Sequence, residues 1–131
     1  MERCLFEIKS GTADKAYTCP GTYEEDDKFI TMNWTEKGED SDKVVFEVSC
    51  DKSSGRTVSR RKGDIAAVLA FEPGRETATV YKTPYGDIDM VIKTHYVNLP
   101  TLMSPALEIS YEIDGQKNLF SVKRLLQNSK N

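Results

Sequence analysis

The sequence predicts an all-β protein built as a single antiparallel meander barrel of about eight to ten strands. Three observations lead to this class. Apolar and polar residues alternate along most of the chain, turn signals separate the alternating runs, and no convincing amphipathic helix is present. We favour a closed barrel over the alternative, a β-sandwich, because closure removes the exposed sheet edges along which chains aggregate.

The first half of the chain contains four alternating runs. Residues 3–9, 29–34, 44–50 and 65–71 place apolar side chains at every second position, as a strand with one buried face does. The segments between them combine glycine with serine, charged residues or proline, which favour turns. These turn signals are Ser53–Gly55, Lys62–Asp64 and Glu72–Gly74.

The segment Tyr81–Thr94 is the clearest strand–corner–strand pattern in the chain. Pro84 fixes its own φ angle and lacks an N–H group, and Gly86 tolerates a positive φ angle. Together they predict a sharp bend or bulge of the kind that a barrel corner needs. The strand that follows alternates from Ile88 to Tyr96, which predicts that Tyr96 faces the same side as Ile88.

The last third of the chain predicts a hairpin and a long loop. Residues 107–114 alternate and end in Asp114-Gly115, a strong hairpin turn signal. Residues 119–127 fit either a strand or a terminal helical turn. The loop 98–105 is long and unusually apolar, so we expect it to pack across one end of the barrel, with a movable lid as the alternative.

Composition limits the class of protein. The 131 residues include 38% hydrophobic and 30% charged residues, which suits one globular domain spanning residues 1–131. The net charge of −3 argues against a nucleic-acid partner, because phosphate binding requires a basic surface. No apolar run is long enough for a membrane helix and no signal peptide is visible, so we expect a cytoplasmic protein with three reduced cysteines.

Motifs that carry chemistry are missing from the sequence. No zinc-binding spacing, phosphate loop or nucleophile elbow occurs, so neither a cofactor nor a metal site is predicted. The single histidine, His95, falls on the same side of its strand as Asp87 and Asp89, which we expect to face solvent. Enzymatic activity is left open, although the sequence favours its absence.

A family resemblance rests on the order of several motifs. They are Gly21-x-Tyr23, Arg61-x-Gly63, Phe71, Gly74, Tyr81-x-Thr-Pro-Tyr-Gly86, Thr94, Ile109-Ser-Tyr111 and Asp114-Gly115. This order resembles the YwiB-like family, small bacterial proteins catalogued as a domain of unknown function, from about residue 3 to residue 125. The resemblance implies a calycin-like, lipocalin-type barrel in a cytosolic bacterial protein and supplies no catalytic residue. The Gly-x-Trp signature of extracellular lipocalins is absent, because Gly21 is followed by Thr22 and Tyr23.

The sequence predicts, as the leading function, binding of a small apolar or anionic ligand inside the barrel. Alternation leaves open whether Arg61 points inward, where it would need an anion or carboxylate partner, or outward. The alternatives are a filled barrel that binds a protein through its outer surface and, ranked last, an enzyme with its site in the barrel mouth. The candidate ligand-binding residues are Arg61, Trp34, Tyr81, Met90, Thr94, Tyr96 and Tyr111.

Overall fold

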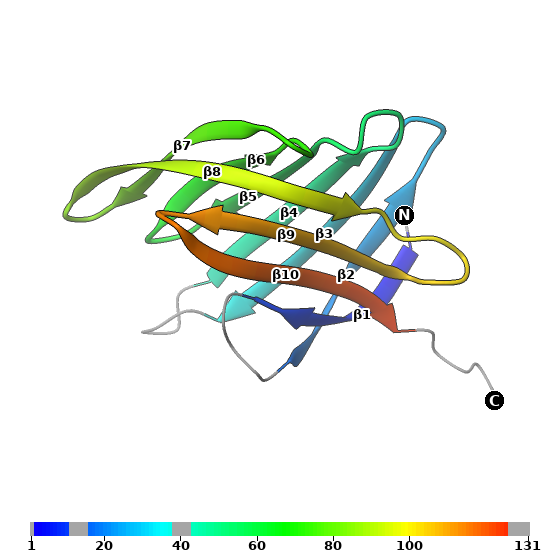
Figure 1. Cartoon of the computed structure of the whole chain (residues 1–131). Coiled ribbons are helices and arrows are strands. Elements are labelled where there is room, and N and C mark those ends of the chain that lie inside the picture. The colour runs from blue at the N-terminus through cyan, green and yellow to red at the C-terminus, as the bar shows by residue number, and fades with distance from the viewer. Residues whose placement is uncertain (1, 11–15, 38–42, 126–131) are drawn as a thin grey trace.

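The protein folds as a closed barrel of ten antiparallel strands in meander order, and β1 pairs with β10 to complete the ring (Figure 1). The structure is a computed structural model that describes residues 2–10, 16–37 and 43–125. The strands are β1 (Glu2–Lys9), β2 (Tyr17–Glu25), β3 (Phe29–Lys37), β4 (Lys43–Asp51), β5 (Thr57–Lys62), β6 (Ala66–Phe71), β7 (Glu76–Thr83), β8 (Gly86–Asn98), β9 (Ala106–Ile113) and β10 (Gln116–Leu125).

The predicted all-β meander barrel is confirmed, and the sandwich alternative is wrong. Residues 119–125, where a helical turn competed with a strand, belong to β10, while residues 126 and 127 lie outside the described residues. The described residues include no helix that is long and apolar enough to cross a membrane.

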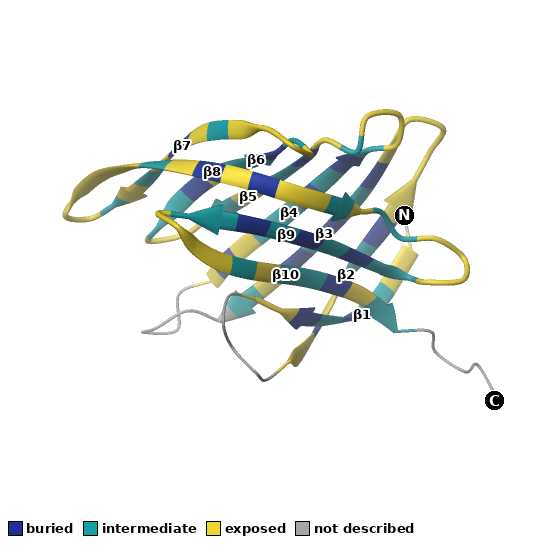
Figure 2. Cartoon of the chain, in the orientation of Figure 1, coloured by how far each residue is buried: buried dark blue, intermediate teal, exposed yellow. Residues whose placement is uncertain are grey.

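Burial alternates along the strands, as Figure 2 shows for β8, where buried residues alternate with exposed ones, and for β9, where buried residues alternate with intermediate ones. The inward side chains pack into one core, because each antiparallel strand directs alternate residues to the barrel interior. The largest fully buried side chains are Phe6, Phe71, Ile8, Ile30, Met32, Ile92, Leu107 and Ile109.

Gly21 allows two aromatic rings to meet across β2. A Cβ atom at this position would lie 2.2 Å from the Asn33 carbonyl oxygen and 2.7 Å from the Phe6 ring. Because glycine leaves this space free, the Phe6 ring reaches Trp34 with 5.8 Å between centroids. Trp34 in turn stacks on Phe46 at 5.3 Å with an interplanar angle of 12°. The result is an aromatic layer across β1, β3 and β4.

The β7–β8 connection is a tight hairpin turn rather than a bend within the barrel wall. Thr83 pairs with Gly86, so Pro84 and Tyr85 form the tip of the hairpin, and Gly86 has a φ angle of 126°. The hairpin projects past the turn between β9 and β10 (Figure 1). The chain changes direction where the sequence predicted, but the prediction of a barrel corner is wrong, because this turn is the tip of a hairpin. Tyr85 at the tip is 100% exposed.

A β-bulge in β8 reverses one predicted orientation. The pairing register of β8 with β9 shifts between Thr94 and Tyr96, so His95 and Tyr96 both face outward. The Tyr96 hydroxyl donates a hydrogen bond to Glu108 at 2.6 Å on the outer surface. The prediction that Tyr96 shares a face with Ile88 is wrong, because the extra residue of a bulge shifts the alternation by one.

The loop 98–105 lies at the end of β8 opposite to the hairpin tip. Its backbone is held by hydrogen bonds from Thr101 N–H to the Ser104 carbonyl oxygen and from Arg124 N–H to the Pro105 carbonyl oxygen. The side chains of Leu102 and Met103 are almost fully exposed. The loop therefore directs Leu102 and Met103 into solvent, while Leu99 packs against the core. Its role as a lid stays a prediction.

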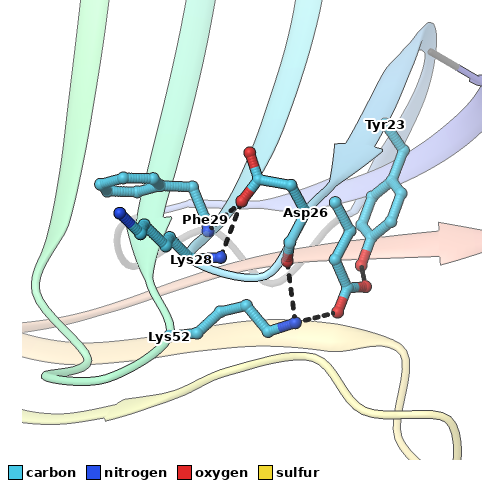
Figure 3. A network of polar contacts seen from close by, with 6 residues as sticks. Tyr23, Asp26, Lys28, Phe29 and Lys52 are labelled. Carbon is cyan, nitrogen blue, oxygen red and sulfur yellow. Dashed lines mark hydrogen bonds and ion pairs between the residues drawn. The ribbon is translucent and has the colours of Figure 1, made fainter.

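A polar network joins the β2–β3 and β4–β5 turns (Figure 3). Lys52 Nζ donates to Glu25 Oε2 at 2.7 Å and to the Asp26 carbonyl oxygen at 3.1 Å, and the Tyr23 hydroxyl donates to Glu25 Oε1 at 2.8 Å. The hydrogen bond from Lys52, and after it the one from Tyr23, hold the pKa of Glu25 below its usual value. Burial and the bond to Glu25 raise the pKa of Tyr23 to about 12.

The Asp26 carboxylate organises the turn itself. Its Oδ1 atom accepts hydrogen bonds from the backbone N–H groups of Lys28 and Phe29, both at 2.8 Å. These two bonds lower the pKa of Asp26. An ionised carboxylate that accepts backbone donors in this way is a common device for fixing a turn.

We predict that Gly21→Ala destabilises the protein by ~1–3 kcal/mol, because the new methyl group collides with backbone and with the Phe6 ring. Urea unfolding followed by Trp34 fluorescence measures the change. Glu24→Ala, an exposed substitution on the same strand, is the control and should change stability little. Equal stability of the two variants would contradict this account of Gly21.

We predict that Lys52→Met raises the pKa of Glu25 toward its ordinary value, because the largest cause of the lowered pKa is removed. In the native protein, ionised Glu25 contributes stability above its unfolded-state pKa, and this contribution is lost as the pH falls through the lowered pKa. NMR titration of the side-chain carboxyl carbons measures the shift. Lys28→Met is the control, and an unchanged Glu25 pKa in Lys52→Met would contradict the network.

Candidate functional site

The barrel interior contains a cavity of about 410 Å³ at the end where the β7–β8 hairpin projects. Inward side chains of β4 to β10 line it, together with Ser10 and Ile65. The cavity arises because the inner positions of β5 and β6 near this end carry smaller side chains, Ser59, Ala67 and Leu69, than the aromatic layer does. The large rings therefore fill one part of the barrel and leave space in another.

The walls of the cavity are mainly apolar. Phe46 lines it and also stacks on Trp34. Phe71 and Tyr111 also line it and contact each other at 5.0 Å with an interplanar angle of 59°. An apolar pocket of this size bounded by aromatic rings is typical of sites that bind small organic molecules.

Arg61 points into this cavity and is the one charged side chain among the described lining residues. Its Nη1 atom donates a hydrogen bond to the Ile65 carbonyl oxygen at 2.6 Å, and Nη2 lies 4.0 Å from the half-exposed Asp64 carboxylate. Its guanidinium carbon lies 5.9 Å from the centroid of the Phe46 ring. Because a guanidinium carries five N–H donors, these contacts leave donors available to an anion.

Two tyrosine hydroxyls accompany Arg61. Tyr81 and Tyr111 both line the cavity, and neither hydroxyl has a hydrogen-bond partner recorded among the described residues. Burial raises the pKa of both phenols, an effect that the charge of Arg61 partly offsets for Tyr81 and that Tyr81 reinforces for Tyr111. Both groups therefore stay protonated at neutral pH and can donate hydrogen bonds.

The structure brings together three of the seven predicted ligand-binding residues, namely Arg61, Tyr81 and Tyr111. Trp34 lies behind Phe46, and its indole N–H donates to Glu36 at 2.9 Å. The other predicted residues belong to β8 and do not line the cavity. Met90 is half-buried, Thr94 is buried, and Tyr96 faces outward.

Sequence reasoning missed most of the apolar wall. By alternation, Phe46 lies on the same strand face as Val48, and Ser59 lies on the same strand face as Arg61. A signal for their inward orientation was therefore present. That signal became usable only with the pairing register, which places Phe46 opposite both Trp34 and Arg61. Phe120 and Ser10 carried no such signal, because only closure of β10 on β1 brings them to this end.

The other groups considered for chemistry lie elsewhere. His95 faces outward as predicted, and its Nε2 atom lies 2.9 Å from Glu112 Oε1. Asp87 and Asp89 are exposed, also as predicted. Cys4, Cys19 and Cys50 are free thiols outside the cavity, and the described residues contain no group of three or more side chains suited to a metal ion.

These features define a class: a closed ten-stranded antiparallel β-barrel with an internal cavity that contains one cationic side chain. The family model described as "Domain of unknown function (DUF1934)" matches residues 7–126, so the chain belongs to this family. The predicted YwiB-like resemblance is thereby confirmed.

A solved structure has the same fold. The crystal structure of ywiB protein from Bacillus subtilis matches with a TM-score of 0.80 and 17% sequence identity, over 97% of this chain and 93% of that chain. At this identity the likeness shows the fold alone. A search of curated proteins gave no match. The calycin-like character implied by the resemblance stays a prediction.

Proposed function

We propose that this protein binds a small, partly apolar organic anion inside the barrel, with the anionic group at Arg61. The observation that carries the proposal is the position of Arg61 as the one charged side chain among the described residues of an apolar cavity. Moving a guanidinium out of water is unfavourable unless hydrogen bonds and an opposite charge compensate it. Asp64 compensates only partly, at 4.0 Å and half exposed.

The neighbouring groups suit a carboxylate or a similar oxyanion. The guanidinium offers paired N–H donors, and the Tyr81 and Tyr111 hydroxyls add further donors within the cavity. The Phe46 and Phe71 rings supply apolar surface for the rest of the molecule. A cavity of about 410 Å³ falls within the range of roughly 300–1,000 Å³ that small-molecule sites occupy.

Binding is preferred to the two other functions that the sequence left open. A filled barrel acting only through its outer surface would leave no cavity of this size. Catalysis ranks behind binding because the described lining residues include no carboxylate, imidazole or thiol, and the two cavity tyrosines, whose pKa burial raises, stay protonated at neutral pH and cannot act as a base. The proposal is therefore a binding protein.

We predict that the protein, purified from its own organism, carries an organic anion that native mass spectrometry detects as a mass adduct. Arg61→Gln should lower the affinity for this molecule by about 10- to 100-fold, because a charge-assisted hydrogen bond is lost. Arg60→Gln removes the same charge from the neighbouring outward-facing residue and should retain the adduct. A protein that is adduct-free in repeated preparations, or equal loss in both variants, would count against the proposal.

A further inference from the structure

The first part of β8 has a strand on one side only. Pairing of β8 with β9 begins at Ile92, which lies opposite Ile113, the last residue of β9. Residues 86–91 pair with β7 on their other side and extend past the β9–β10 turn (Figure 1). Within the described part of the chain, these residues therefore form a free sheet edge. A second gap in the backbone pairing lies between β6 and β7, for which two residue pairs are recorded among the described residues, Ala66 with Lys82 and Ala67 with Tyr81.

The free edge presents unpaired backbone groups. In an antiparallel strand, alternate residues direct their N–H and C=O groups away from the partner strand. Apart from the pairing with β7, no backbone hydrogen bond is recorded for residues 86–91 among the described residues. Such an edge can accept the backbone of another extended segment, which then adds one strand to the sheet.

The two faces of this edge differ in chemistry. On the inner face Ile88 lines the rim of the cavity and is 48% exposed. On the outer face Asp87 and Asp89 are exposed, and these two carboxylates are the side chains of β8 that an added strand would lie beside. Asp89 and Asp114 also line an outer groove whose basic residues, Arg60, Arg61, Lys62 and Lys82, come from β5 and β7, on the far side of β8 from an added strand. None of these three carboxylates takes part in an ion pair recorded among the described residues. An added strand would meet an apolar surface on one face and negative charge on the other.

The negative charge excludes a second copy of this chain as the partner. Antiparallel pairing of two copies that uses five of the six residues 86–91 is centred on Ile88 or Asp89, because β9 covers the strand from Ile92 onward. Centring on Ile88 places Asp87 opposite Asp89, and centring on Asp89 places that residue opposite itself. Like charges directly opposite each other destabilise a strand pair.

We infer that the free edge of β8 binds an extended peptide segment that alternates basic and apolar side chains. The peptide backbone pairs with residues 86–91, its basic side chains lie over Asp87 and Asp89, and its apolar side chains pack toward Ile88 at the cavity rim. This interaction surface adjoins the proposed anion site, with which it shares Ile88, and it requires no anion in the cavity. The partner is therefore a protein with an exposed strand or tail of this pattern.

The test uses a blocked hexapeptide that alternates lysine and valine, titrated into the full chain and followed by NMR and calorimetry. We expect the amide signals of residues 86–91 to shift and their hydrogen exchange to slow. Replacing lysine by glutamate in the peptide should abolish binding. Methylating the backbone nitrogens that face β8 should also abolish it, whereas methylating the alternate set should be tolerated.

Variants of the protein test the charge requirement. Asp87→Lys/Asp89→Lys should weaken binding of the lysine–valine peptide by about tenfold or more, because two attractive pairs become repulsive. The control variant Glu24→Lys/Asp27→Lys makes the same change of charge near the β2–β3 turn and should bind as the native protein does.

Several results would overturn the inference. They are no binding at about 1 mM peptide, equal binding of the lysine and glutamate peptides, and equal tolerance of both methylated sets. Equal weakening by the two charge-reversal variants would show that net charge alone is responsible. Dimerisation of the peptide-free protein with protected amides at residues 86–91 would show that a second copy occupies the edge instead.

Discussion

Closure of β10 on β1 is the constraint on which the rest of this structure depends. The pairing of Leu5–Lys9 with Ser121–Leu125 converts one long sheet into a ring with a single interior. Every inward side chain must then pack within that ring, and unfilled volume becomes a cavity rather than solvent-exposed surface. Gly21 lets Phe6 meet Trp34 across β2, so the aromatic layer fills its part of the barrel. The cavity lies where smaller residues replace such rings.

The cavity and the free edge are two consequences of the same strand lengths. The β7–β8 hairpin is longer than its neighbours, and its extension both forms one wall of the cavity rim and leaves β8 without a partner there. Ile88 belongs to both features, because it lines the cavity and lies on the free edge. A molecule in the cavity and a strand on the edge would therefore lie close together. Arg61 lines the cavity and also borders the outer groove that contains Asp89.

Much of the fold could be predicted because alternation and turn residues act locally. The runs at residues 44–50 and 65–71 became β4 and β6, and Asp114-Gly115 formed a tight turn with positive φ angles at both residues. The candidate site was predicted less completely. Tyr96 was assigned to the inner face, because a bulge leaves no mark in an alternating pattern. Pro84 and Gly86 favour a change of direction equally well in a hairpin and in a barrel corner.

The sequence by itself determined the all-β class, the meander of short strands, the outward position of His95 and the family. These follow from residue periodicity, turn chemistry and motif order, which neighbouring residues along the chain establish. Only the tertiary structure decided that Arg61 points inward, that Tyr81 and Tyr111 accompany it, and that Trp34 lies behind Phe46. Those relations depend on strand register and barrel closure, which join residues far apart in the chain and leave no local pattern.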